Sequence, residues 1–212
     1  RTPEAAARVR RAGETPGPWT EALDGAEAVV NLSGAPITLP WTPKNRRLIL
    51  DSRVKSTEAI GLALHKCKAP PAVWINGSAT GFYGDREDEM LTEESPPGDG
   101  FLSDVCQAWE AAQAGFRVPG TRLVRIRTGV VLGPEGGALD AWEKLTRFFL
   151  GGSQGDGSQW LPWIHLDDLV ELFLWTMDEP VEGVFNGTAP NPVRNGRFMA
   201  QLRQVIGRPW SP

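Results

Sequence analysis

The chain has 212 residues, of which 41% are hydrophobic and 23% charged, a composition typical of a globular domain with a real core. Its net charge of -4 argues against a nucleic acid or an anionic membrane surface as a partner, and no apolar run approaches the ~20 residues of a membrane span. The two cysteines, Cys67 and Cys106, and the two histidines have no metal-ligand spacing. We therefore expect free thiols, a cytoplasmic location and no metal site.

Short apolar runs alternate with helical segments along the chain. The first strand is expected at 28–32 and ends in Ser33-Gly34. A long helix is expected at 43–67, because Thr42 suits the N-cap and a proline suits the first position. The later elements are expected to be strands at 72–76, 123–127 and 184–186 and helices at 101–114, 138–150, 167–177 and 196–206. This alternation predicts an α/β fold with a doubly wound parallel sheet.

Residues 75–84 read Ile-Asn-Gly-Ser-Ala-Thr-Gly-Phe-Tyr-Gly and are the most informative stretch of the chain. An apolar run here ends in small hydroxyl and glycine residues. A buried parallel strand looks like this where it delivers polar groups to the carboxyl edge of its sheet. Ligands of open α/β sheets bind at that edge. The stretch therefore predicts a ligand site, with Ser78 as its candidate catalytic residue.

Four segments in this order carry a family resemblance, and together they cover nearly the whole chain. They are Asn-Leu-Ser-Gly-Ala at 31–35, Asp-Ser-Arg-Val-Lys-Ser-Thr at 51–57, the stretch at 75–84, and Trp-Ile-His-Leu-Asp-Asp-Leu at 163–169. This set resembles the extended short-chain dehydrogenases/reductases, which include nucleotide-sugar epimerases. The second segment is similar to one branch in particular, the epimerase-like NAD(P)-dependent oxidoreductases once labelled cell-division-inhibitor homologues.

The resemblance implies a Rossmann domain and a set of cofactor contacts. Leu32, Ser33 and Gly34 would pack on the adenosine half of the cofactor, Arg53 would lie over it, and Val130 would line the nicotinamide. If the chain begins just after the second strand of the family fold, Arg1 opens the loop that reads the adenosine ribose. An arginine there favours the 2′-phosphate of NADP over NAD.

The same resemblance breaks at the usual acid/base pair. Family enzymes use Tyr-x-x-x-Lys, but Leu102 and Cys106 stand at those two positions. Tyr83 is the only tyrosine, and four residues later comes Glu87 instead of lysine. This form is typical of the branch. The resemblance to the larger family implies that Ser78 would hold the substrate oxygen. The proton donor stays open. His165 invites a general-base role, although in the family this histidine mainly organises its loop.

No strand and no Gly-x-x-Gly-x-x-Gly turn precede residue 28. We therefore expect residues 1–190 to form a Rossmann domain without its first strand and glycine-rich loop, and residues 191–212 to begin a truncated small C-terminal domain. The sequence leaves open whether the whole protein contains the missing parts.

The favoured function is that of an oxidoreductase or epimerase-like enzyme that uses NADP(H) on a small carbonyl or sugar-like substrate. A non-catalytic regulator that binds NADP(H) is the first alternative, because the Tyr-x-x-x-Lys pair is missing. A nucleotide-sugar epimerase is the second, and it needs an extended substrate domain. The substrate, the direction of reaction and the oligomeric state stay open.

Overall fold

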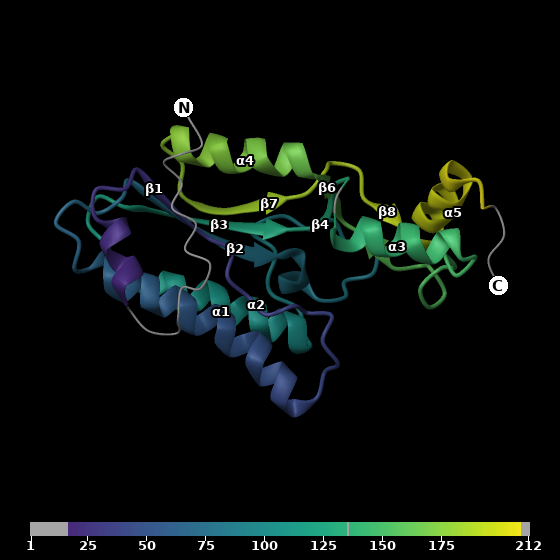
Figure 1. Ribbon diagram of the computed structural model, residues 1–212, viewed down its shortest axis with the longest axis horizontal. Coiled ribbons are helices and arrows are strands. Elements are labelled where there is room, and N and C mark those ends of the chain that lie inside the picture. Colours follow the sequence, from purple (N-terminus) through teal and green to yellow (C-terminus); the bar gives the residue numbers. More distant parts are fainter. Residues whose placement is uncertain (1–16, 135, 209–212) are drawn as a thin grey trace.

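A parallel four-stranded sheet forms the centre of the computed structural model, which describes residues 17–134 and 136–208 (Figure 1). Its strands follow the order β1-β2-β3-β7, and every neighbouring pair is parallel. Their bounds are Ala28–Asn31, Val73–Ala79, Arg122–Thr128 and Gly183–Gly187. Helices α1 (Pro43–Leu64) and α2 (Phe101–Ala114) cover one face, and α4 (Leu166–Asp178) covers the other. The predicted doubly wound sheet is thus confirmed.

The middle strand β2 is buried on both faces, and its side chains alternate between two hydrophobic clusters. Trp74 packs with Ile60 and Leu64 of α1. Val73 and Ile75 belong to the cluster on the α4 side. Because successive side chains of a strand point to opposite faces, Asn76 and Ser78 share the face of Trp74. The polar end of β2 is therefore directed toward α1 and α2.

All the predicted strands and helices are present, and each except the helix at 101–114 differs from its predicted bounds by one to three residues at one or both ends. Thr42 caps α1 by accepting from the Asn45 backbone N–H at 3.3 Å, as predicted, but α1 ends at Leu64. β2 continues three residues past its predicted end, to Ala79. The extension is possible because Gly77 lies under Trp109, where an added Cβ would come within 3.0 Å of the indole.

A second group of elements lies beyond the carboxyl end of the sheet (Figure 1). There α3 (Gly137–Arg147) packs on α5 (Asn195–Ile206), and the Trp142 and Phe198 rings meet edge to face at 5.2 Å. The short strands of this region were not predicted, because two or three residues carry no periodicity. They are β4 (Val130–Leu132), β5 (Trp160–Leu161), β6 (Trp163–His165) and β8 (Val193–Arg194).

Two short 3₁₀ helices, η2 (Pro18–Leu23) and η3 (Thr80–Tyr83), complete the described elements. The η3 turn directly follows β2 and carries Tyr83 into the interior. Within residues 17–134 and 136–208, no helix has the length and apolar character needed to cross a membrane.

Candidate active site

Three polar side chains stand in line across the carboxyl end of the sheet. Ser78 on β2 is the register partner of Arg127 on β3, and Arg127 is the partner of Asn186 on β7. Register partners in parallel strands point to the same face, so all three are directed toward the α2 side. The sequence indicated Ser78. It did not indicate that Arg127 and Asn186 stand beside Ser78, because strand pairing is not visible in one sequence.

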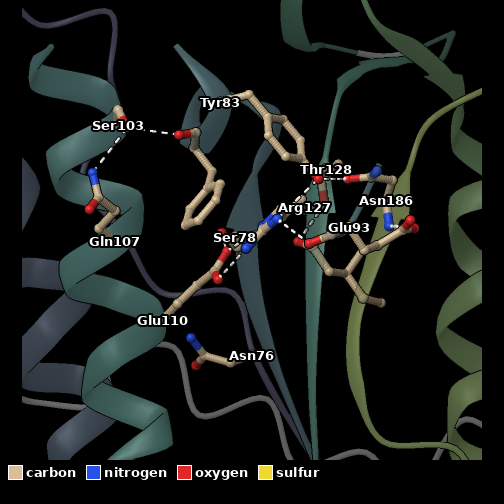
Figure 2. A network of polar contacts seen from close by, with 12 residues as sticks. Asn76, Ser78, Tyr83, Glu93, Ser103, Gln107, Glu110, Arg127, Thr128 and Asn186 are labelled. Atoms are coloured by element: carbon tan, nitrogen blue, oxygen red, sulfur yellow. Dashed lines mark hydrogen bonds and ion pairs between the residues drawn. The ribbon is translucent and has the colours of Figure 1, made fainter. Parts of the chain in front are cut away.

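Glu110 of α2 joins this line and neutralises Arg127 (Figure 2). Arg127 donates from Nε to Oε1 at 2.8 Å and from Nη2 to Oε2 at 2.9 Å. The two side chains are only 4% and 8% exposed. Burial disfavours the charge of Arg127, but hydrogen bonds to Glu110 and Tyr83 outweigh burial and raise the pKa of the guanidinium. The result is a buried, fully paired charge at the edge where ligands bind.

Tyr83 and the loop after η3 close the other side of this network. Arg127 Nη1 donates to the Tyr83 hydroxyl at 3.0 Å, and that hydroxyl donates to Asn186 Oδ1 at 2.6 Å. Glu93 accepts from Asn186 N through Oε1 at 2.8 Å and from Arg127 Nη1 through its backbone oxygen at 3.2 Å. The only tyrosine is thus committed to holding the network and is 3% exposed.

Ser78 belongs to the same network. Its hydroxyl donates to Glu110 Oε1 at 2.6 Å, and the residue is 5% exposed (Figure 2). Ser78, the predicted catalytic serine, therefore lies at the carboxyl edge of the sheet, and its hydroxyl already donates a hydrogen bond to a carboxylate.

A second buried network supports the loop that follows β1. Asn31 donates to Asn76 Oδ1 at 2.7 Å and to Thr57 Oγ1 at 3.0 Å, and its own Oδ1 accepts from Ser33 N at 3.1 Å. Trp109 Nε1 of α2 donates to Thr57 Oγ1 at 3.1 Å. Helices α1 and α2 are therefore joined to β1 directly behind the predicted cofactor loop.

The loop itself is open to a ligand, and Arg53 reaches it from α1. Leu32 is 66% exposed, and Ser33 and Gly34 follow it at the surface end of β1. Arg53 Nη1 donates to Ala35 O at 3.1 Å and to Ile49 O at 3.0 Å. An added Cβ on Gly34 would stand 2.8 Å from Arg53 Cζ, so the loop rests directly on the guanidinium. The structure brings these predicted cofactor residues together.

The positions of the missing Tyr-x-x-x-Lys pair lie beside η3. An added Cβ on Gly81 would be 3.4 Å from Leu102 Cβ and 3.9 Å from Cys106 Sγ. Burial raises the pKa of the Cys106 thiol to about 11, so the thiol stays protonated near neutral pH. Cys106 therefore supplies neither a base nor a nucleophile there.

The remaining predicted residues lie apart from the network. His165 caps α4, because its Nδ1 accepts from Asp167 N at 3.2 Å, which agrees with a loop-organising role. Val130 opens β4 and pairs with Trp163, and its N–H donates to Pro162 O at 2.7 Å. Arg1 lies outside the described residues. Among the residues that are described, no cluster of histidine, cysteine or carboxylate side chains could hold a metal ion.

Comparisons with known proteins agree with this arrangement. A chloroplastic epimerase family protein SDR39U1 homolog of Arabidopsis thaliana is 42% identical over 200 residues, which are 92% of this chain and 57% of that protein. An epimerase family protein of Staphylococcus haemolyticus is 38% identical over 92% of this chain and 67% of its own length. The chain thus spans between one half and two thirds of these two relatives.

Solved structures extend the likeness to three dimensions. The crystal structure of human epimerase family protein SDR39U1 (isoform 2) with NADPH superposes with a TM-score of 0.84 at 34% identity, over 94% of this chain and 72% of that one. A nucleoside-diphosphate sugar epimerase from Corynebacterium glutamicum gives a TM-score of 0.78 at 35% identity, over 96% of this chain and 44% of that one. Residues 14–188 match the model of the NAD dependent epimerase/dehydratase family, and this chain belongs to that family.

Proposed function

We propose that this protein is an NADP(H)-dependent oxidoreductase or epimerase-like enzyme that acts on a small carbonyl or sugar-like substrate. One observation carries the proposal. The exposed loop formed by Leu32, Ser33 and Gly34 lies on the Arg53 guanidinium at the end of β1. A dinucleotide needs small residues where its backbone approaches the chain and a fork of donors for its phosphate or ribose.

The residues of this loop suit the cofactor. Within the described part of the chain, both hydrogen bonds of the Arg53 side chain are made by Nη1. The Nη2 and Nε donors thus stay available for a phosphate oxygen. The human relative at 34% identity has NADPH bound, which supports the choice of nucleotide. We propose Arg1 and Val130 as further contacts to the ribose end and the nicotinamide end. When bound, NADP(H) supplies or accepts the hydride.

Ser78 is proposed to orient the reacting oxygen. To donate to it, the hydroxyl must turn away from Glu110, and a hydroxyl rotates without moving heavier atoms. Glu110 keeps both bonds from Arg127 after that rotation, so its carboxylate stays paired. The network thus lets Ser78 exchange one acceptor for another at small cost, while holding the serine oxygen in place.

A non-catalytic regulator that binds NADP(H) is the second candidate. The residues at the two positions of the missing Tyr-x-x-x-Lys pair favour it. Leu102 cannot transfer a proton, and the pKa of the Cys106 thiol is about 11 because of burial. A protein that binds NADP(H) without turnover needs neither group.

A turnover screen separates the two candidates. The intact protein is mixed with NADPH and a broad panel of aldehydes, ketones and keto sugars, and the nucleotide absorbance is followed. NADPH oxidation that depends on both protein and carbonyl supports the enzyme. NADPH binding by calorimetry without turnover on any member of the panel favours the regulator.

We also propose that a boundary near residue 190 separates the Rossmann domain from the start of a small C-terminal domain. The contact between α3 and α5 supports a second unit that draws on residues 137–147 as well as on residues 191–212.

A further inference from the structure

A cluster of two aromatic rings and one cation lies where α1 and α2 begin. Trp41 precedes the first turn of α1, and Phe101 is the first residue of α2. Their rings meet edge to face at 5.2 Å. The Arg46 guanidinium lies 4.9 Å from the centre of the Phe101 ring and 5.7 Å from that of Trp41. The cluster thus fixes a cation at the surface on an aromatic support.

Hydrogen bonds of the preceding loop hold this support in shape. Trp41 Nε1 donates to Ile37 O at 3.0 Å, and Asn45 Nδ2 donates to Pro40 O at 2.8 Å. The indole is nevertheless 46% exposed, and Ile37 is 48% exposed. The Trp41 ring is therefore held against the Ile37 backbone, while much of the surface of both residues is open to water. A ligand that covers the Trp41 ring therefore loses little binding free energy to the ordering of that side chain.

Arg46 and its neighbour Arg47 differ in whether a carboxylate pairs with the guanidinium. Arg47 lies next to Arg46 on α1 and pairs with Asp51 at 3.5 Å. Between residues 17 and 208, leaving aside residue 135, no carboxylate forms an ion pair with exposed Arg46. A guanidinium on aromatic rings keeps its N–H edge free, and that edge matches the two oxygens of a carboxylate.

The cluster adjoins the candidate active site along two segments of chain. Phe101 directly precedes Leu102, which lies against Gly81 of η3, two residues after the end of β2. The loop that ends at Trp41 begins at Leu32, where the cofactor contacts are proposed. A molecule seated on Arg46 and Trp41 therefore lies on segments of chain that lead into the proposed cofactor loop and into the helix that packs beside η3.

We propose that Arg46 binds the carboxylate of a small organic substrate whose apolar body covers Ile37 and Trp41. The inference rests on the proposed function in one respect, because it takes the ligand to be the carbonyl substrate. It adds to that function a substrate class, a carbonyl compound that also bears a carboxylate.

The experiment compares two probes that differ in charge, 4-formylbenzoate and 4-formylbenzamide. Their affinities for the intact NADPH-loaded protein are measured by calorimetry. The acid should bind about tenfold more tightly than the amide. Arg46→Gln should abolish this preference and leave the affinity for the amide unchanged. Arg47→Gln is the matched control, since it removes a neighbouring exposed arginine whose charge is already paired, and it should keep the preference.

Equal affinity of the wild type for the two probes overturns the inference, and so does a preference that survives Arg46→Gln. Weaker NADPH binding in Arg46→Gln also overturns it, because the anion at Arg46 would then be the cofactor itself. A preference lost only in Arg46→Gln supports the carboxylate site even if the turnover screen finds no reduction of any carbonyl on the panel, a result that would contradict only the proposed enzymatic activity. The binding preference thus tests the carboxylate site, and turnover separately tests the proposed enzymatic activity.

Discussion

Arg127 on β3 and Glu110 on α2 form a buried ion pair through two parallel hydrogen bonds of 2.8 and 2.9 Å. The pair joins the sheet to α2 at the carboxyl edge, beside Ser78, which precedes Ala79, the last residue of β2. Because the guanidinium holds Glu110, the carboxylate is fixed where it accepts from the Ser78 hydroxyl. The ion pair thus connects β3, α2 and Ser78 of β2 within the candidate site.

Glu110→Gln should lower the free energy of unfolding by about 3–5 kcal/mol, because it leaves the Arg127 charge buried without a carboxylate. Urea denaturation measures the loss. Glu143→Gln is the control, since Glu143 pairs with Arg147 on the surface of α3, and there the loss should be about 0.5 kcal/mol or less. Similar small losses in both variants would contradict the role of the buried pair.

Cys106 should make the protein less stable in alkali. Burial raises the pKa of its thiol to about 11 in the folded chain, so above about pH 9 the unfolded chain loses this proton while the folded chain keeps it. Stability is therefore complete below that range and falls as the pH rises toward 11, by up to about 2–3 kcal/mol.

Urea denaturation at pH 8 and pH 10.5 tests this expectation. The drop between the two pH values should be smaller in Cys106→Ala than in the wild type, whatever stability the cavity itself costs. Cys67→Ala is the control, because Cys67 is only half-buried. An equal drop in the wild type and in Cys106→Ala contradicts the expectation.

Ser78→Ala should reduce turnover by on the order of 100-fold and leave the NADPH dissociation constant unchanged, because the hydroxyl is proposed to act on the substrate oxygen. Cys106→Ser should change turnover much less. Ser103→Ala removes another buried hydroxyl, one that donates to Phe82 O at 2.7 Å, and controls for loss of stability alone. If Ser78→Ala lowers only the melting temperature, Ser78 is a structural member of the network.

Gly34→Ala should weaken NADPH binding by about tenfold with little change in stability. The added Cβ would lie 2.8 Å from Arg53 Cζ, and the flexible end of that side chain is the part that must move. Gly115→Ala is the control, since its Cβ would meet nothing closer than 3.6 Å. Calorimetry with NADPH reads the difference. Unaltered binding by Gly34→Ala would separate this loop from the cofactor.

The sequence predicted those parts of the fold that depend on local pattern. The helix at 101–114 has the predicted bounds, because Gly100 and Gly115 flank a continuous amphipathic run. β2 continues past its apolar residues, because Gly77 and Ser78 pair with Ile126 and Arg127 of a strand that is distant in sequence. Tertiary pairing of this kind has no local signal.

In the candidate site, too, the features carried by contiguous residues were predicted and those that depend on tertiary packing were not. The proposed cofactor loop and Ser78 were both indicated by contiguous residues. The partner of Ser78 was not, since Glu110 is 32 residues away and meets it only through the packing of α2 on β2. The Trp41, Arg46 and Phe101 cluster was also missed, because it joins the starts of two helices that are far apart in the chain.

Calorimetric titration of the intact protein with NADPH and NADH tests the central claim most directly. NADPH should bind at least about tenfold more tightly, or ~1.4 kcal/mol. Arg53→Ala should weaken NADPH binding by ~1.5–3 kcal/mol, because a charged hydrogen bond is lost, whereas Arg47→Ala should not weaken it. Equal affinities for the two nucleotides, together with an unchanged NADPH dissociation constant in Arg53→Ala, would contradict the account.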